Sequence, residues 1–257
     1  MKEVNYNKKL DILFEKWKIE SGKNGHTGFC ADGLMFRGGK GKDDNYVWRE
    51  PGDENNLWLN APKRILFLLK DTNGNPNDDN REFYPGANGK IDLANRNIAY
   101  WFYGLLNFNE EKDAPDFDSL DFKNDVYPTF DSMPYAFVNC KKESGGSTIS
   151  DGVLREHIEL YAKYIKEEIE ILDPDIIVCG GGSSIIKNFV IEKIYTDVEK
   201  INNWIYYDKK NNKVIIDSYH PSYFQIEGGS NTIYTKMMES YKAFLAKYPN
   251  FRKSCRK

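Results

Sequence analysis

Short runs of consecutive apolar residues alternate along the chain with longer stretches in which apolar residues recur every three or four positions. The short runs predict buried strands at 65–69, 135–140, 175–179 and 214–217, and a smaller strand at 204–207. The longer stretches predict helices over 5–20, 92–108, 151–172 and 232–247. Strands that alternate with helices are typical of α/β proteins, so we expect a three-layer α/β/α fold with a mostly parallel central sheet.

The first 62 residues differ from the rest of the chain. The helix predicted at 5–20 is followed by a stretch rich in Gly and Asp, from Ser21 to about Glu54, with few regular signals. The first strong strand pattern begins only at Ile65. We interpret residues 1–62 as an N-terminal helix and an irregular extension packed on the core, and residues 63–257 as the α/β domain.

Length and charge narrow the classes of function. The 257 residues, 40% of them hydrophobic, suffice for one sizeable core. The net charge of −3 argues against a protein that coats nucleic acid regardless of sequence, but it permits a local basic patch. The basic residues that such a patch would use are otherwise ordinary solvated surface charges: Lys63, Arg64, Lys70, Lys141, Lys142 and the tail 252–257.

The apolar runs and the spacing of the cysteines indicate the cellular compartment. No apolar run reaches membrane-spanning length, and the N-terminus has no apolar signal segment. Cys30, Cys140, Cys179 and Cys255 are far apart and form no CxxC pair, which favours core thiols over metal ligands. We expect a cytoplasmic monomer with no membrane contact, no disulfide, no metal and no cofactor.

Two segments that are far apart in the sequence carry the strongest catalytic candidates. The run ILFLL is followed by KDTNGNP, which contains Asp71, and the run VIID is followed by SYHPSYFQ, which contains His220. In an open parallel sheet the carboxyl ends of the strands border one crevice, so these two segments are expected to face the same site. Taken singly, each residue also has a structural interpretation: Asp71 as a turn-forming side chain and His220 as a buried, hydrogen-bonded histidine.

Four segments in order resemble the uracil-DNA glycosylase superfamily: KDTNG after ILFLL, FVNCKK after PYA, DPDIIVCGGGSS, and SYHPSYF. The family has a first motif of the GQDPYH or GxNPG kind, then an Asn-bearing strand end, a P-x-x-I-V strand and an HPS motif. The similarity covers roughly residues 63–227 and leaves the first 62 unexplained. The resemblance implies the family's fold and the removal of a base from DNA.

The resemblance also assigns roles to residues. Asp71 and His220 match the catalytic Asp and His, and Asn139 matches the residue that reads the base edge. The aromatic that stacks on the flipped base corresponds to Phe83 or Tyr84, and the apolar wedge corresponds to Phe224. Lys70 and Asn73 lie in the first motif, and Ser222 and the small residues around Gly74 are placed to meet phosphates.

The chemistry of base removal explains why such residues are needed. Cleavage of an N-glycosidic bond builds positive charge on the sugar and negative charge on the departing base. A carboxylate such as Asp71 stabilises the cation and orients water, while His220 donates a hydrogen bond to the base, each worth about 10²–10⁴ in rate. The base must also leave the duplex stack, which requires a reader, an aromatic face and a side chain that fills the gap.

The departures from the family pattern bear on specificity. Leu69 and Lys70 replace Gly-Gln or Gly-Glu, and Thr72 replaces the Pro of the first motif. Asn73 stands where the family has the Tyr that blocks a pyrimidine 5-methyl group, so we expect relaxed specificity toward a 5-modified or mismatched pyrimidine. The N-terminal CxxC of the iron–sulfur relatives is missing, and only Cys140 matches a cluster ligand.

Three functions remain open from the sequence. The first is a metal-independent DNA glycosylase that acts in base repair or in defence against modified invading DNA. The second is an inactive protein of the same fold that binds nucleic acid or a protein, which the acidic pI of about 5.8 and the altered first motif favour. The third is a hydrolase of free nucleosides or nucleotides. The presence of both Asp71 and His220 favours the glycosylase.

Overall fold

The computed structural model describes residues 5–35, 39–40, 46–47, 53–82, 91–109, 113–146 and 148–251. Its main sheet has seven strands in the order β1-β5-β4-β6-β9-β8-β7. Their bounds are β1 (Gly33–Leu34), β4 (Ile65–Thr72), β5 (Ala136–Ser144), β6 (Ile176–Gly180), β7 (Val198–Lys200), β8 (Ile205–Asp208) and β9 (Lys213–Ser218). A separate two-stranded ribbon pairs β2 (Gly39–Lys40) with β3 (Tyr46–Val47).

The sheet is mixed, with a parallel centre and antiparallel margins. Strands β5, β4, β6 and β9 run parallel to one another. Strand β1 is antiparallel to β5, and β8 and β7 continue beyond β9 as antiparallel neighbours. The expectation of a mostly parallel sheet was therefore wrong at the margins, where the short strands β1, β8 and β7 add in the antiparallel sense.

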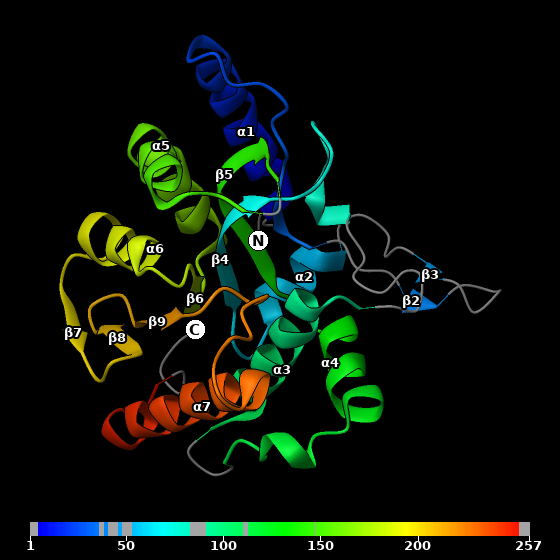
Figure 1. Cartoon of the computed structure of the whole chain (residues 1–257), viewed down its shortest axis with the longest axis vertical. Coiled ribbons are helices and arrows are strands. Elements are labelled where there is room, and N and C mark those ends of the chain that lie inside the picture. The colour runs from blue at the N-terminus through cyan, green and yellow to red at the C-terminus, as the bar shows by residue number, and fades with distance from the viewer. Residues whose placement is uncertain are drawn as a thin grey trace.

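Helices cover both faces of the sheet (Figure 1), as an α/β fold requires. Helices α1, α5 and α6 lie on one face, and α3, α4 and α7 lie on the other. Each face has its own apolar core, and the central strands are buried between the two. The helix bounds are α1 (Tyr6–Lys23), α2 (Asp53–Asn60), α3 (Leu93–Asn107), α4 (Tyr127–Ser132), α5 (Asp151–Leu172), α6 (Ile185–Phe189) and α7 (Gly229–Lys247).

The predicted helices are confirmed, and polar residues cap the start of three of them. Asn5, Asp92 and Ser150 each accept a hydrogen bond from a backbone N–H in the first turn of α1, α3 and α5. Helix α5 ends at Asp173, whose left-handed backbone (φ 46°) stops the helix before Pro174. None of the described helices is long and apolar enough to cross a membrane.

The strands at the candidate site are longer than their apolar runs. Strand β4 continues through Asp71 to Thr72, and β5 continues through Lys141 to Ser144. The two extensions pair with each other, Asp71 opposite Lys141, with a register shift before Thr72 pairs with Ser144. Both strands thus extend past their predicted ends at residues 69 and 140, because backbone pairing persists where the side chains become polar.

The N-terminal residues contribute to the sheet and to one core. Strand β1 pairs with β5, and α1 packs against α5. Trp58 of α2 is fully buried in the same core, and its indole N–H donates to the Leu172 carbonyl at 2.8 Å. The described residues between 21 and 54 therefore include more paired backbone than the sequence suggested, in β1, β2, β3 and the bridge from Phe29 to Glu143. The domain boundary at residue 62 stays a prediction.

Candidate active site

Asp71 and His220 both lie at the carboxyl ends of parallel strands. Strands β4 and β9 flank β6, and the register aligns Leu68 with Cys179 and Cys179 with Asp217. Asp71 lies within β4, three residues after Leu68, and His220 lies two residues after the end of β9. No hydrogen bond or ion pair joins the two side chains among the described residues, but the charge of Lys70 acts on both.

The strand between them, β6, ends in a buried glycine. An ideal Cβ at Gly180 would lie 2.7 Å from Leu69 Cδ2 and 3.2 Å from Pro221 Cδ. The segments that carry the two candidates therefore close over the end of β6, where any other residue would push them apart. Gly182 (φ 76°) then turns the chain toward α6, as expected for a strand-to-helix turn without a phosphate-binding motif.

The Asp71 carboxylate is available for chemistry. It is half-buried beside Gly145, and among the described residues it has no hydrogen-bond or ion-pair partner. Burial raises the pKa of Asp71, although the charges of Lys141 and Lys70 act in the opposite direction. The carboxylate therefore lies close to the positive charges of Lys141 and Lys70.

The structural interpretation of Asp71 as a turn-forming side chain does not hold. Other side chains stabilise the turn that follows β4. Thr72 Oγ1 accepts from the Gly74 N–H at 3.2 Å, and Asp78 Oδ2 accepts from the Asn75 N–H at 2.8 Å. Ser144 of β5 donates to the Gly74 carbonyl at 2.6 Å, which fixes this turn against the neighbouring strand.

His220 is held in one orientation by Ser222. The Ser222 N–H donates to His220 Nδ1 at 3.3 Å, and the Ser222 hydroxyl lies 2.7 Å from the same nitrogen. Because Nδ1 accepts a backbone hydrogen bond, the neutral ring carries its proton on Nε2. Nε2 has no hydrogen-bond partner among the described residues, so this N–H is free to donate to a substrate.

Lys70 couples the two candidates electrostatically. Burial lowers the pKa of His220, and the positive charge of Lys70 lowers it further. The same charge favours the ionised form of Asp71. Lys70 itself lies 3.9 Å from Asp151 at the start of α5, which keeps its ammonium over the strand ends. The field of Lys70 thus favours an anionic Asp71 beside a neutral His220.

Asn139 lies on β5 opposite Leu69 and is buried. Both its backbone N–H (2.8 Å) and its Nδ2 (3.0 Å) donate to Asp32 Oδ2. The amide is therefore already oriented by a residue of the N-terminal segment, with Oδ1 unpaired among the described residues. Asn139 Oδ1 is the part of this side chain that a ligand would contact.

The other predicted contact residues lie in the segments that follow β4 and β9 or outside the described residues. Phe224 is 59% exposed in the loop after His220, an unusual position for so large an apolar side chain. Asn73 is exposed on the turn after β4, and Ser222 is exposed beside His220. Phe83 and Tyr84 lie outside the described residues.

The structure adds two residues that sequence reasoning missed, Gly145 and Asn97, and places a third, Lys141, that the sequence offered only as part of a basic patch. Lys141 is a second lysine near Asp71, and Gly145 lies directly against the Asp71 carboxylate. Asn97 of α3 is buried and donates to the Pro221 carbonyl at 2.7 Å, which fixes the loop after His220. The polar KKESGGST segment signalled Lys141 and Gly145, whereas an Asn within an apolar helix gave no sign of its distant partner.

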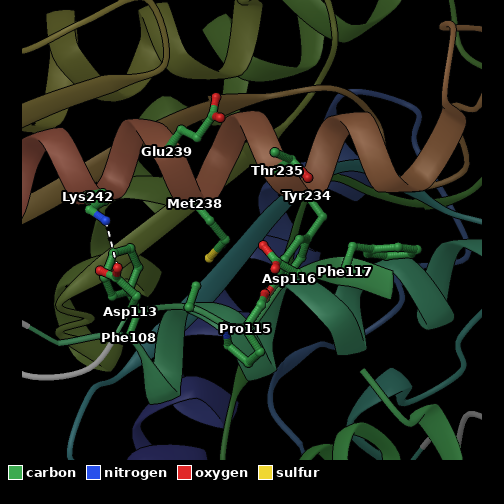
Figure 2. Close-up of a pocket in the computed structure, with 11 residues that line it drawn as sticks. Phe108, Asp113, Pro115, Asp116, Phe117, Tyr234, Thr235, Met238, Glu239 and Lys242 are labelled. Atoms are coloured by element: carbon green, nitrogen blue, oxygen red, sulfur yellow. Dashed lines mark hydrogen bonds and ion pairs between the residues drawn. The ribbon is translucent and has the colours of Figure 1, made fainter. Parts of the chain in front are cut away.

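A pocket between α7 and the segment 113–117 lies elsewhere (Figure 2). Phe108 lines this pocket, and its carbonyl accepts a hydrogen bond from Lys63, just before β4 begins. Asp71 lies at the other end of that strand. Lys242 and Asp113 form an ion pair at the rim of the pocket (2.7 Å). This pocket is therefore separate from the candidate site.

Comparison with known proteins does not identify the chain. No protein-family model matches it, and no curated protein is significantly similar to it.

Proposed function

We propose that this protein is a DNA glycosylase that hydrolyses the N-glycosidic bond of a flipped pyrimidine and leaves an abasic site. The observation that carries the proposal is an unpartnered carboxylate and a free imidazole N–H at the carboxyl ends of β4 and β9, both close enough to Lys70 for its charge to act on them. We infer that a nucleoside binds with its sugar toward Asp71 and its base toward His220.

The charge states of the two groups fit this reaction. Ionised Asp71 stabilises the positive charge that develops on the sugar and orients the attacking water. Neutral His220 donates its Nε2–H to the base carbonyl on which negative charge develops. Lys70 adds positive charge on the side of the departing base, which further stabilises the anion.

The surroundings suit a flipped base in DNA. In this proposal Asn139 Oδ1 accepts a hydrogen bond from the base edge, and the exposed Phe224 fills the gap left in the duplex. Asn73 is exposed and smaller than the Tyr of the family motif that it resembles, so we infer that a substituent at position 5 of the pyrimidine is tolerated. A 5-modified or mismatched pyrimidine is therefore the proposed substrate, consistent with repair or with defence against modified DNA.

The decisive experiment measures alkali-induced strand cleavage. Duplex and single-stranded oligonucleotides would carry uracil, mismatched thymine or one of several 5-modified cytosines. We expect product from the wild type and a loss of about 10²–10⁴ in rate for Asp71→Asn and His220→Ala. Asp113→Asn is the matched control, because Asp113 forms a surface ion pair with Lys242 away from the site. Phe224→Ala should impair cleavage of duplex more than of single strands.

Each alternative predicts its own result in this assay. Abasic sites that persist in both the Asp71 and His220 variants would contradict the assigned roles. DNA binding without product on any substrate would favour the inactive binding module. Activity on free nucleosides that survives Phe224→Ala, without activity on duplex, would favour the nucleoside hydrolase. Cleavage of uracil with every 5-substituted base untouched would refute the relaxed specificity assigned to Asn73.

A further inference from the structure

Three potential metal-ligating side chains meet near the end of β5, on the face of the sheet that α1 and α5 cover. They come from three segments: His26 from the loop after α1, Glu143 from the end of β5, and His157 from α5. His26 Nδ1 lies 3.4 Å from Glu143 Oε1, and His157 Nδ1 lies 3.2 Å from Glu143 Oε2. All three ligand atoms lie within 4.8 Å of one another.

Two of these groups are buried, and each has one ligand atom without a hydrogen bond among the described residues. His157 is 6% exposed and Glu143 is 8% exposed. His157 Nδ1 and Glu143 Oε2 face each other, yet neither makes a hydrogen bond of acceptable geometry with any described residue. Buried polar atoms are nearly always paired, so two unpaired ligand atoms that point at the same spot call for a bound group.

The distances suit a small divalent ion. Nitrogen and oxygen ligands lie about 2.0–2.1 Å from Zn²⁺, and tetrahedral geometry then separates two ligand atoms by roughly 3.4 Å. Each imidazole nitrogen lies close to this distance from a Glu143 oxygen, His26 Nδ1 from Oε1 and His157 Nδ1 from Oε2, so the carboxylate has one oxygen facing each histidine.

We propose that His26, Glu143 and His157 bind one divalent transition-metal ion of the Zn²⁺ type. Two imidazoles and one carboxylate form a donor set typical of zinc and its neighbours in the first transition row. The Tyr161 hydroxyl, 2.7 Å from His26 Nδ1, and the Ser21 hydroxyl, 3.0 Å from Glu143 Oε1, are nearby oxygens for a fourth position. The ion would replace the hydrogen bond between His26 and Tyr161.

The backbone holds this site together before any ion arrives. Phe29 forms an antiparallel bridge with Glu143, and the Cys30 N–H donates to the Lys142 carbonyl at 2.7 Å. His157 is fixed by its burial in α5, whereas His26 is part-exposed and its ring stacks on His157 with centroids 4.7 Å apart. His26 is therefore the ligand that turns to admit the ion. A bound ion would link the N-terminal segment to β5 and α5.

The test uses the full chain, stripped of metal with a chelator and dialysed. Zn²⁺ binding would be measured by calorimetry, and Co²⁺ binding by its visible spectrum. We expect one ion per chain, no near-ultraviolet thiolate band, and a melting temperature that rises with Zn²⁺. His157→Gln, Glu143→Gln and His26→Asn should each weaken Zn²⁺ binding by at least about 100-fold, more than the 10–100-fold typical of outer-shell partners.

Glu156→Gln is the matched control, because it removes the same charge from an exposed neighbour of His157 and should bind Zn²⁺ like the wild type. His26→Asn changes a part-exposed loop residue, so it keeps the test decisive if a buried variant fails to fold. The proposal is overturned if the folded wild type binds no stoichiometric Zn²⁺, if all variants bind alike, or if Co²⁺ gives a thiolate spectrum. None of these outcomes depends on glycosylase activity.

Discussion

At the scale of single residues, the absence of a side chain at Gly145 leaves the space that Asp71 occupies. A Cβ at position 145 would collide with Asp71 Oδ2 and lie 3.2 Å from its Cγ. Gly145→Ala should therefore displace the carboxylate and lower glycosylase activity by at least tenfold, because roughly 1.4 kcal/mol of lost stabilisation has that effect. Gly146→Ala is the control, since nothing lies within 4 Å of its Cβ. Equal activity of the two variants would show that the position of Asp71 is unimportant.

Lys70 offers a test of the charge states that does not require a substrate. Its positive charge disfavours the imidazolium form of His220 and favours the carboxylate form of Asp71. Lys70→Met should therefore raise both pKa values and move the acid limb of kcat/KM to higher pH. NMR titration of the chain's three histidines, with His220→Ala for assignment, measures the first effect directly. A His220 pKa above the ordinary value of about 6.5 in the wild type would contradict this description.

At the scale of elements, helix α3 positions the loop after β9 through one buried amide. Asn97 Nδ2 donates to the Pro221 carbonyl, directly after His220. Asn97→Ala leaves that carbonyl unpaired and should lower the free energy of unfolding by about 1–3 kcal/mol. Because the loop that carries His220 loses this hydrogen bond, activity should fall as well. Urea unfolding and the cleavage assay measure the two effects.

The control for Asn97 is Asn107→Ala. Asn107 lies on the same helix, and its amide donates to Tyr103 within that helix, so no other element depends on it. Similar losses in both variants would mean that Asn97 acts only within α3.

The elements themselves were largely predictable, because the central strands and long helices carry unambiguous apolar periods. The predicted helix 151–172 matches α5 at both ends, since Ser150 caps its start and Pro174 follows its end. The ends of β4 and β5 were not predictable, because their last residues are polar and pair only with each other. The relation of Asn139 to Asp32 was equally hidden, since it depends on how the N-terminal segment meets the sheet. Sequence patterns therefore located Asp71 and His220, but not the residues that position them.

At the scale of the whole molecule, a buried charge cluster joins the N-terminal segment to the core. Lys142 of β5 pairs with Asp32, which precedes β1, and with Glu168 of α5 at 2.8 Å. All three side chains are almost fully buried. Burial alone would lower the pKa of Lys142, but the two carboxylates outweigh burial and raise it. Burial raises the pKa of Glu168 well above its ordinary value, so we interpret Glu168 as protonated and the cluster as charge-balanced.

This charge balance predicts that two substitutions differ strongly in their effect on stability. Lys142→Met leaves the Asp32 carboxylate buried without a cation and should destabilise the fold by about 3–5 kcal/mol in urea unfolding. Glu168→Gln retains a neutral side chain and should change stability far less, at neutral pH. The sign follows from the raised pKa of Glu168. Ionising Glu168 costs more in the folded state than in the unfolded state, so the protein loses stability as pH rises from the unfolded pKa through the folded pKa. Gln does not ionise, so the Glu168→Gln protein should not show this loss. Lys166→Met, which breaks only an exposed pair with Glu170, should have little effect.

A Glu168→Gln protein as unstable as Lys142→Met would mean that Glu168 is ionised. The N-terminal segment would then be held by a net negative cluster, and Asp32 could not keep Asn139 in place without Lys142.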